Sequence, residues 1–190
     1  MLRRLGPATL VFALAVWAAC GDDPVSYSAP VGISLKARSA STVGGVVRDE
    51  KSINTESGNP YGTFVADARA RIGHDPAIID VERVELRLGP SSTAVTALGD
   101  VFAGTFDVVF EMNDTNVPYP VASGTIDAAT AAGPIELDSV FPADEIPDIE
   151  YLKLLLGSFK VVTRGPAAPA FAMKGADADL EVTLTFAAFE

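Results

Sequence analysis

Apolar and polar residues alternate along most of this chain, and this period of two predicts β-strands. The clearest example is the C-terminal segment 179–186, where Leu180, Val182, Leu184 and Phe186 alternate with charged and hydroxyl side chains. Similar patterns predict strands over residues 31–37, 43–48, 78–88, 101–112, 119–127, 135–140 and 159–164. Segment 101–112 is the most apolar of these, so we expect it to be the central strand of the core.

Two segments depart from this alternation and follow helical spacing instead. In residues 63–72 the apolar side chains recur every three to four positions, with Thr63 as the expected N-cap and Gly73 as the end. Residues 148–156 predict a second short helix, or a loop with one helical turn, that Asp148 caps and Gly157 ends. We therefore expect two small helices beside the strands.

Short strands separated by turn residues predict a mostly β fold. We expect an antiparallel β-sandwich or partly closed barrel of about seven to nine strands, with the two short helices added. The alternative is an α+β domain in which the helices cover one face of a single sheet. Residues 31–190 are expected to form one such domain, because their number suits a single hydrophobic core.

The N-terminal segment has the form of an export signal. Arg3 and Arg4 precede an apolar run over residues 10–19, which is too short to cross a bilayer as a helix. Residues 17–20 read WAAC, and Cys20 is the only cysteine. This arrangement resembles the lipobox of bacterial lipoproteins, although Trp17 stands where that family has a Leu-like residue.

The resemblance implies a signal peptide over residues 1–19 and a lipidated Cys20 that carries diacylglycerol and palmitate. Residues 20–30 would then form the lipidated cysteine and a short tether, and the lipid would hold the protein at the cell envelope. Gly21, rather than Asp, follows the cysteine, which favours the outer membrane if the host is Gram-negative. Two alternatives stay open: an ordinary signal peptide cut near Ala19, and a cytosolic chain with an apolar N-terminus.

The charge balance excludes some partners. The chain has 190 residues, with 14 Lys and Arg against 25 Asp and Glu, and its formal net charge is −11. Such an acidic surface argues against nucleic acid and against anionic lipid bound through the folded face. With one cysteine, the chain has no disulfide framework.

Residues with catalytic potential are few. His74 is the only histidine, no G-x-S-x-G sequence occurs, and no phosphate or dinucleotide fingerprint is present. Asp177 and Asp179 form a weak calcium candidate, and a second group of acids lies at residues 144–150. For both groups we favour solvated surface charges, and we expect no catalytic residue, metal or cofactor.

Three functions follow, each with a structural requirement. The favoured one is a non-catalytic binding or structural domain with an envelope protein or glycan as partner, which should expose an apolar or aromatic patch. A carrier of an apolar ligand would need a cavity of several hundred Å³ lined by Phe102, Phe106 and Phe110. The third, an envelope hydrolase, would need two carboxyl groups in one cleft, one with a raised pKa.

Overall fold

A computed structural model describes residues 25–56 and 58–190 of the chain. The signal-peptide segment and Cys20 lie outside the described residues. The elements are β1 (Ser26–Arg38), β2 (Val46–Ile53), α1 (Pro60–Ile72), β3 (Ile78–Leu88), β4 (Gly104–Met112), β5 (Pro118–Ile126), β6 (Ile135–Ser139), α2 (Asp148–Leu156), β7 (Phe159–Pro166) and β8 (Asp177–Phe189). No helix in these ranges is long and apolar enough to cross a bilayer.

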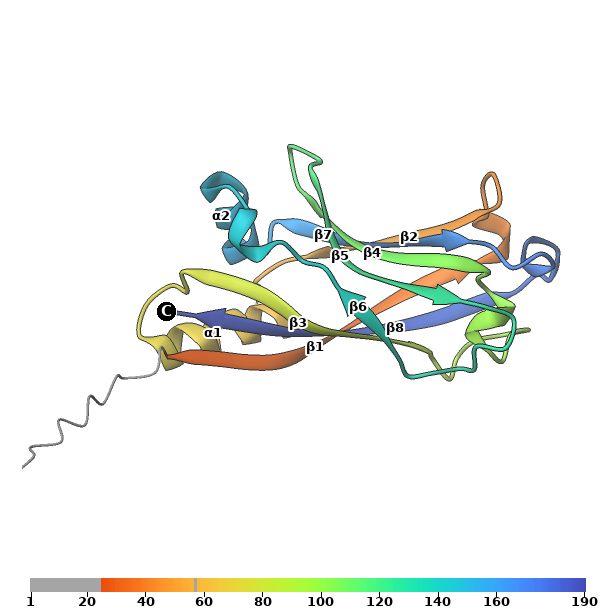
Figure 1. Cartoon of the computed structure of the whole chain (residues 1–190), viewed down its shortest axis with the longest axis horizontal. Coiled ribbons are helices and arrows are strands. Elements are labelled where there is room, and N and C mark those ends of the chain that lie inside the picture. Colours follow the sequence, from red (N-terminus) through yellow and green to blue (C-terminus); the bar gives the residue numbers. More distant parts are fainter. Residues whose placement is uncertain (1–24, 57) are drawn as a thin grey trace, which may run out of the picture.

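The eight strands of the described chain form one antiparallel sheet that curls into a nearly closed barrel (Figure 1). Their order is β1-β8-β3-β6-β5-β4-β7-β2, so β1 and β2 are the two edges that approach each other without a ladder. The short β6 joins the two halves, because it pairs with β3 on one side and with β5 on the other. The expected mostly β fold, with a partly closed barrel and two helices, is confirmed.

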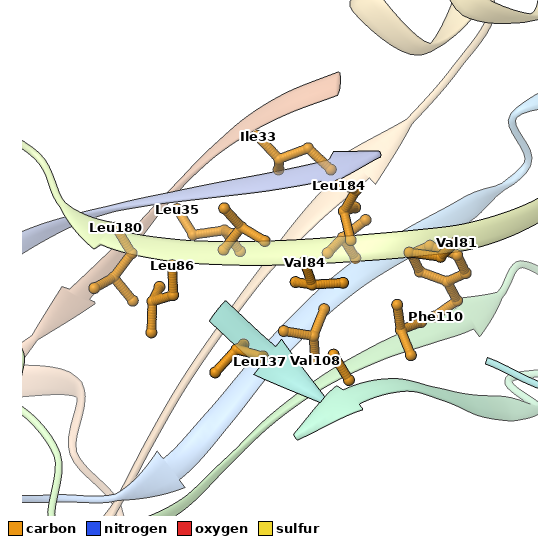
Figure 2. Packing of buried hydrophobic residues seen from close by; sticks show 14 of the residues in the cluster. Ile33, Leu35, Val81, Val84, Leu86, Val108, Phe110, Leu137, Leu180 and Leu184 are labelled. Atoms are coloured by element: carbon orange, nitrogen blue, oxygen red, sulfur yellow. The ribbon is translucent and has the colours of Figure 1, made fainter. Parts of the chain in front are cut away.

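The core fills the space between the curled halves. Side chains from β1, β3, β4, β6 and β8 meet there, among them Leu35, Val84, Val108 and Leu184 (Figure 2). The barrel is filled because each strand sends every second side chain inward, as the alternation in the sequence requires. As expected, β4 is an interior strand, since it pairs with both β5 and β7.

Helix α1 lies against β1 at one end of the barrel and adds aromatic rings to the core. Tyr61 lies 5.2 Å from Phe159 and 5.0 Å from Phe186, measured between ring centroids. The expected cap at Thr63 is wrong, because Asn59 is the N-cap and its side chain accepts a hydrogen bond from the Tyr61 amide at 3.0 Å. Pro60 is compatible with the first helical turn, so the helix begins three residues earlier than its apolar spacing indicates.

Strand β1 begins earlier than the sequence predicts. Residues 26–30, which we expected to belong to the tether, pair with the end of β8. Pro30 is accommodated because β1 is an edge strand. The Glu190 amide bonds to the Val25 carbonyl and the Ser39 amide to the Ala176 carbonyl, so the odd positions of β1 pair with β8. Pro30 is at an even position, where the backbone N–H of any other residue would point away from the ladder. The lack of an N–H at Pro30 therefore removes no hydrogen bond to β8.

Three other boundaries also differ from the predictions. β2 runs from Val46 to Ile53, so the strand expected over residues 43–48 both begins and ends later than predicted. β4 begins at Gly104, and the preceding residues form a turn in which Phe102 is still buried. Asp148 does not cap α2, because Pro147 occupies the N-cap and no side chain there accepts a capping bond. In each case tertiary contacts, which local patterns do not contain, decide the boundary.

Candidate interaction surface

Helix α2 exposes apolar residues in addition to Leu154 and Leu155, which it buries. Ile149, Leu152 and Leu156 are 67%, 55% and 63% exposed, whereas the charged Glu150 is only 5% exposed. The three apolar residues follow i, i+3, i+7 spacing, so they lie on one face of the helix. A surface helix normally points such a face at the core. Within residues 25–56 and 58–190, the outward face of α2, defined as Ile149, Leu152 and Leu156, is therefore an unpartnered apolar surface.

The buried side of α2 is held by an ion pair. Lys153 Nζ lies 3.2 Å from Glu150 Oε2 and donates to the Asn113 carbonyl at 2.7 Å and to Thr115 Oγ1 at 3.0 Å. The Thr115 hydroxyl lies 3.3 Å from the Glu150 carboxylate. Asn113 and Thr115 belong to the β4–β5 turn, so this network ties the polar side of the helix to that turn. Glu150 and Lys153 therefore lie on the buried side of α2 together with Leu154 and Leu155, and Ile149, Leu152 and Leu156 remain exposed.

Two tyrosines fix α2 to the same end of the barrel as α1. The buried Tyr61 of α1 donates its hydroxyl to the Leu154 carbonyl at 2.9 Å. Tyr151 donates to the Pro76 carbonyl at 2.5 Å. Burial raises the pKa of Tyr151 to about 12, so its hydroxyl remains protonated and able to donate at neutral pH. Leu154 and Leu155 join the core, so the outward face rests on a well-anchored helix.

Exposed acids at the first residue of α2 and in the turn before it form what we call the acidic border of the outward face. Asp144, Glu145 and Asp148 are exposed, and none of them forms an ion pair within residues 25–56 and 58–190. Acids on the strands are often paired: Arg83 lies 3.1 Å from Glu136, for example. The outward face of α2 is therefore apolar at its centre and negatively charged at its border.

A second feature is the seam, by which we mean the gap between the edge strands β1 and β2, where no ladder joins the two strands in the described part of the chain. Even positions of β1 face the seam, and the Lys36 amide there donates to the Asp49 carboxylate at 2.6 Å. A pocket of about 240 Å³ lies along the seam. It is lined by residues 31–34 of β1, residues 51–53 of β2, and Asn59 and Pro60. Asp49 and Lys51 share a face of β2 with the buried Val47 and Ile53. Charges at such positions of an edge strand oppose its pairing with another strand.

The two calcium candidates, Asp179 and Asp177, differ in their surroundings. Asp179 accepts from the Ser91 hydroxyl, and Lys36 Nζ lies 3.5 Å from its carboxylate. The Ser91 bond and the Lys36 charge hold the pKa of Asp179 below its usual range. Asp177 is exposed at the start of β8. The described residues contain no group of three or more His, Cys, Asp or Glu side chains suited to a metal ion.

His74 and the acids with shifted pKa values are the remaining candidates. His74 is exposed just after α1, and its Nδ1 lies 2.7 Å from the Asp75 carbonyl. The carboxyl pKa shifts are downward: the Thr96 amide and the Lys174 ammonium lower the pKa of Asp100 to about 2, and Lys160 and Arg48 lower that of Glu50.

The phenylalanines proposed to line a ligand cavity are core residues. Phe102, Phe106 and Phe110 are all fully buried, and the rings of Phe102 and Phe106 meet edge to face at 4.8 Å. The pocket at the seam is lined by other residues. These rings therefore pack against protein rather than around an open space.

Sequence comparisons do not assign this chain to a known family. No protein-family model matches the sequence, and no curated protein is significantly similar to it. Sequence reasoning placed α2 correctly but missed its outward face. The signal was present, because residues 148–156 contain two apolar stripes, and only the partners of Glu150 and Lys153 decide which stripe is buried.

Proposed function

We propose that this protein is an exported, lipid-anchored lipoprotein of the cell envelope whose β-barrel domain binds rather than catalyses. In this proposal Cys20 carries the lipid, and the outward face of α2 is the binding surface. An outer-membrane location follows if the host is Gram-negative. The proposal rests on the lipobox-like sequence WAAC at residues 17–20 and on the apolar surface at α2.

The observation that carries the binding role is the exposed apolar face of α2. Three aliphatic side chains face water while an ion pair is buried beneath them. Isolated apolar residues on a surface need no explanation, but a helix face anchored in this orientation is a mark of an interaction site. Aliphatic side chains cannot hydrogen-bond to sugar hydroxyls, so this face favours an apolar partner over a glycan.

The two alternatives find less support. A carrier of an apolar ligand would need space beside Phe102, Phe106 and Phe110, which instead pack tightly. A carboxylate hydrolase would need one acid with a raised pKa, whereas the pKa values of Glu50, Asp100 and Asp179 are lowered. Binding through α2 requires neither arrangement.

The anchor is tested first, with the full chain and a Cys20→Ala variant in a Gram-negative host. We expect the wild-type chain to incorporate labelled palmitate and to sediment with membranes, and the variant to do neither. A Met173→Cys chain serves as a control, because that change leaves Cys20 intact and alters an exposed residue outside the proposed binding surface. Unlabelled, soluble wild-type chain would refute the lipoprotein assignment.

A further inference from the structure

We infer that the outward face of α2 is a second membrane contact, which lies in the interface of the bilayer that holds the lipid. This inference rests on the proposed function, because it requires Cys20 to be the anchor. It adds the occupant of the face: a lipid surface rather than a protein.

The beginning of the described chain and α2 share one end of the barrel (Figure 1). A short series of hydrogen bonds connects them across neighbouring strands. The Glu190 amide donates to the Val25 carbonyl at 3.1 Å, and the Ala77 amide donates to the Phe189 carbonyl at 2.9 Å. Tyr151 of α2 then donates to the Pro76 carbonyl. Since adjacent strands lie about 4.8 Å apart, the starts of β1 and β3 are roughly 10 Å from each other.

The number of residues before Val25 limits how far this end can stand from the bilayer. Cys20 precedes Val25 by five residues, and five residues span at most about 18 Å when fully extended. β1 includes residues 26–30, so no longer linker follows Val25. A lipid on Cys20 would thus hold this end of the barrel, with α2, against the membrane surface.

The chemistry of α2 fits the interface of a bilayer. Its polar groups Glu150 and Lys153 are already satisfied inside the protein, so only Ile149, Leu152 and Leu156 would enter the headgroup region. Interfacial helices bury such a face to a shallow depth. Lipid anchors bind more firmly with a second contact, because the first contact raises the local concentration of the second.

The acidic border defines the type of lipid. Asp144, Glu145 and Asp148 precede Ile149 in the chain and are exposed. They would repel anionic headgroups within about 8 Å, the screening length at physiological salt. Insertion of α2 should therefore be deepest in zwitterionic bilayers and should decrease as the anionic fraction rises. A basic interfacial helix shows the opposite dependence, because anionic lipids strengthen its binding.

The test places a fluorescent probe on the helix of the full, lipidated chain. Cys20 is the only cysteine and is acylated in this state, so Leu152→Cys supplies one free thiol for a polarity-sensitive dye. A Met173→Cys chain is the matched control. Met173 is also apolar and exposed, but it precedes β8 and lies near the opposite end of the barrel. Both chains are reconstituted in phosphatidylcholine vesicles that contain nitroxide-labelled lipid.

We expect the dye at position 152 to shift to shorter wavelength and lose intensity to the nitroxide, and the dye at position 173 to do neither. Replacing part of the phosphatidylcholine with phosphatidylglycerol should reduce both changes at position 152. Palmitate labelling and co-sedimentation of the same samples test the anchor separately. If the chain is acylated and vesicle-bound while position 152 stays in water, the inference is overturned and the lipoprotein assignment stands.

Two further results would also overturn the inference. If position 152 is unaffected by vesicles but cross-links to a protein in intact envelopes, the outward face belongs to a protein partner. If the chain carries no lipid at all, the proposed function fails and the membrane contact fails with it.

Discussion

The buried ion pair under α2 can be tested by replacing Lys153 with Met, which has similar length but no charge. Lys153 Nζ contacts Glu150 Oε2 at 3.2 Å, the Asn113 carbonyl at 2.7 Å and Thr115 Oγ1 at 3.0 Å. The variant loses all three contacts and leaves the Glu150 carboxylate buried with only the Thr115 hydroxyl beside it. We therefore expect Lys153→Met to destabilise the fold.

The expected loss in the free energy of unfolding follows from the burial of the Lys153–Glu150 pair. Removing one partner of a buried pair costs about 3–5 kcal/mol. The Lys153 and Glu150 side chains are 15% and 6% exposed, so water reaches the lysine and the lower end applies, about 3 kcal/mol. For a domain of this size each kcal/mol lowers the melting temperature by roughly 2–4 °C, which gives a decrease of roughly 6–12 °C. Urea unfolding should show a lower midpoint with an unchanged slope.

A double variant and a control complete the experiment. Glu150→Leu combined with Lys153→Met removes the charge as well as its partner, so its free energy of unfolding should return to within about 1 kcal/mol of the wild type. Lys160→Met is the control, because Lys160 Nζ lies 2.7 Å from Glu50 but both side chains are about one-third exposed. That exposed pair should contribute no more than about 1 kcal/mol.

The reasoning would be refuted if Lys153→Met costs no more than Lys160→Met. It would also be refuted if the double variant is as unstable as the single one, because the cost would then come from lost packing and not from an unpaired charge. The comparison separates the effect of burial from that of distance. The exposed Lys160–Glu50 contact, at 2.7 Å, is shorter than the buried Lys153–Glu150 contact, at 3.2 Å.

Three further predictions concern the rest of the barrel. Gly157→Ala should destabilise by more than about 1 kcal/mol in urea unfolding, because residue 157 has φ 65° and a Cβ would lie 2.8 Å from the backbone before α1. Phe110→Ala should cost about 3–5 kcal/mol in the same assay, since the fully buried ring would leave a cavity. Asp100→Asn should destabilise above pH 4 and progressively less towards pH 2. The Thr96 amide and Lys174 lower the folded pKa of Asp100 to about 2, so its stabilisation is lost as pH falls from the ordinary value near 3.9 through that pKa; equal differences at pH 7 and pH 2.5 would contradict this.

Local patterns in the sequence were enough to identify most elements. Alternation in β8 and β4 and helical spacing in α1 reflect which side chains must leave water, and this information is contained in short segments. Together these segments predicted the fold class and the presence of two helices. The same patterns missed the start of β1, because Ser26 to Pro30 gain their order from pairing with β8 and not from their own side chains.

The candidate surface was decided by tertiary structure. The sequence of α2 allows either apolar stripe to be buried. Partners from distant segments choose between them: Asn113 and Thr115 hold the charged side, and Tyr61 bonds to the Leu154 carbonyl. Periodicity describes which residues share a face, but the direction of that face depends on contacts between residues far apart in the chain. The sequence thus determined the elements and the lipobox-like segment, while only the packed barrel determined that Ile149, Leu152 and Leu156 face outward.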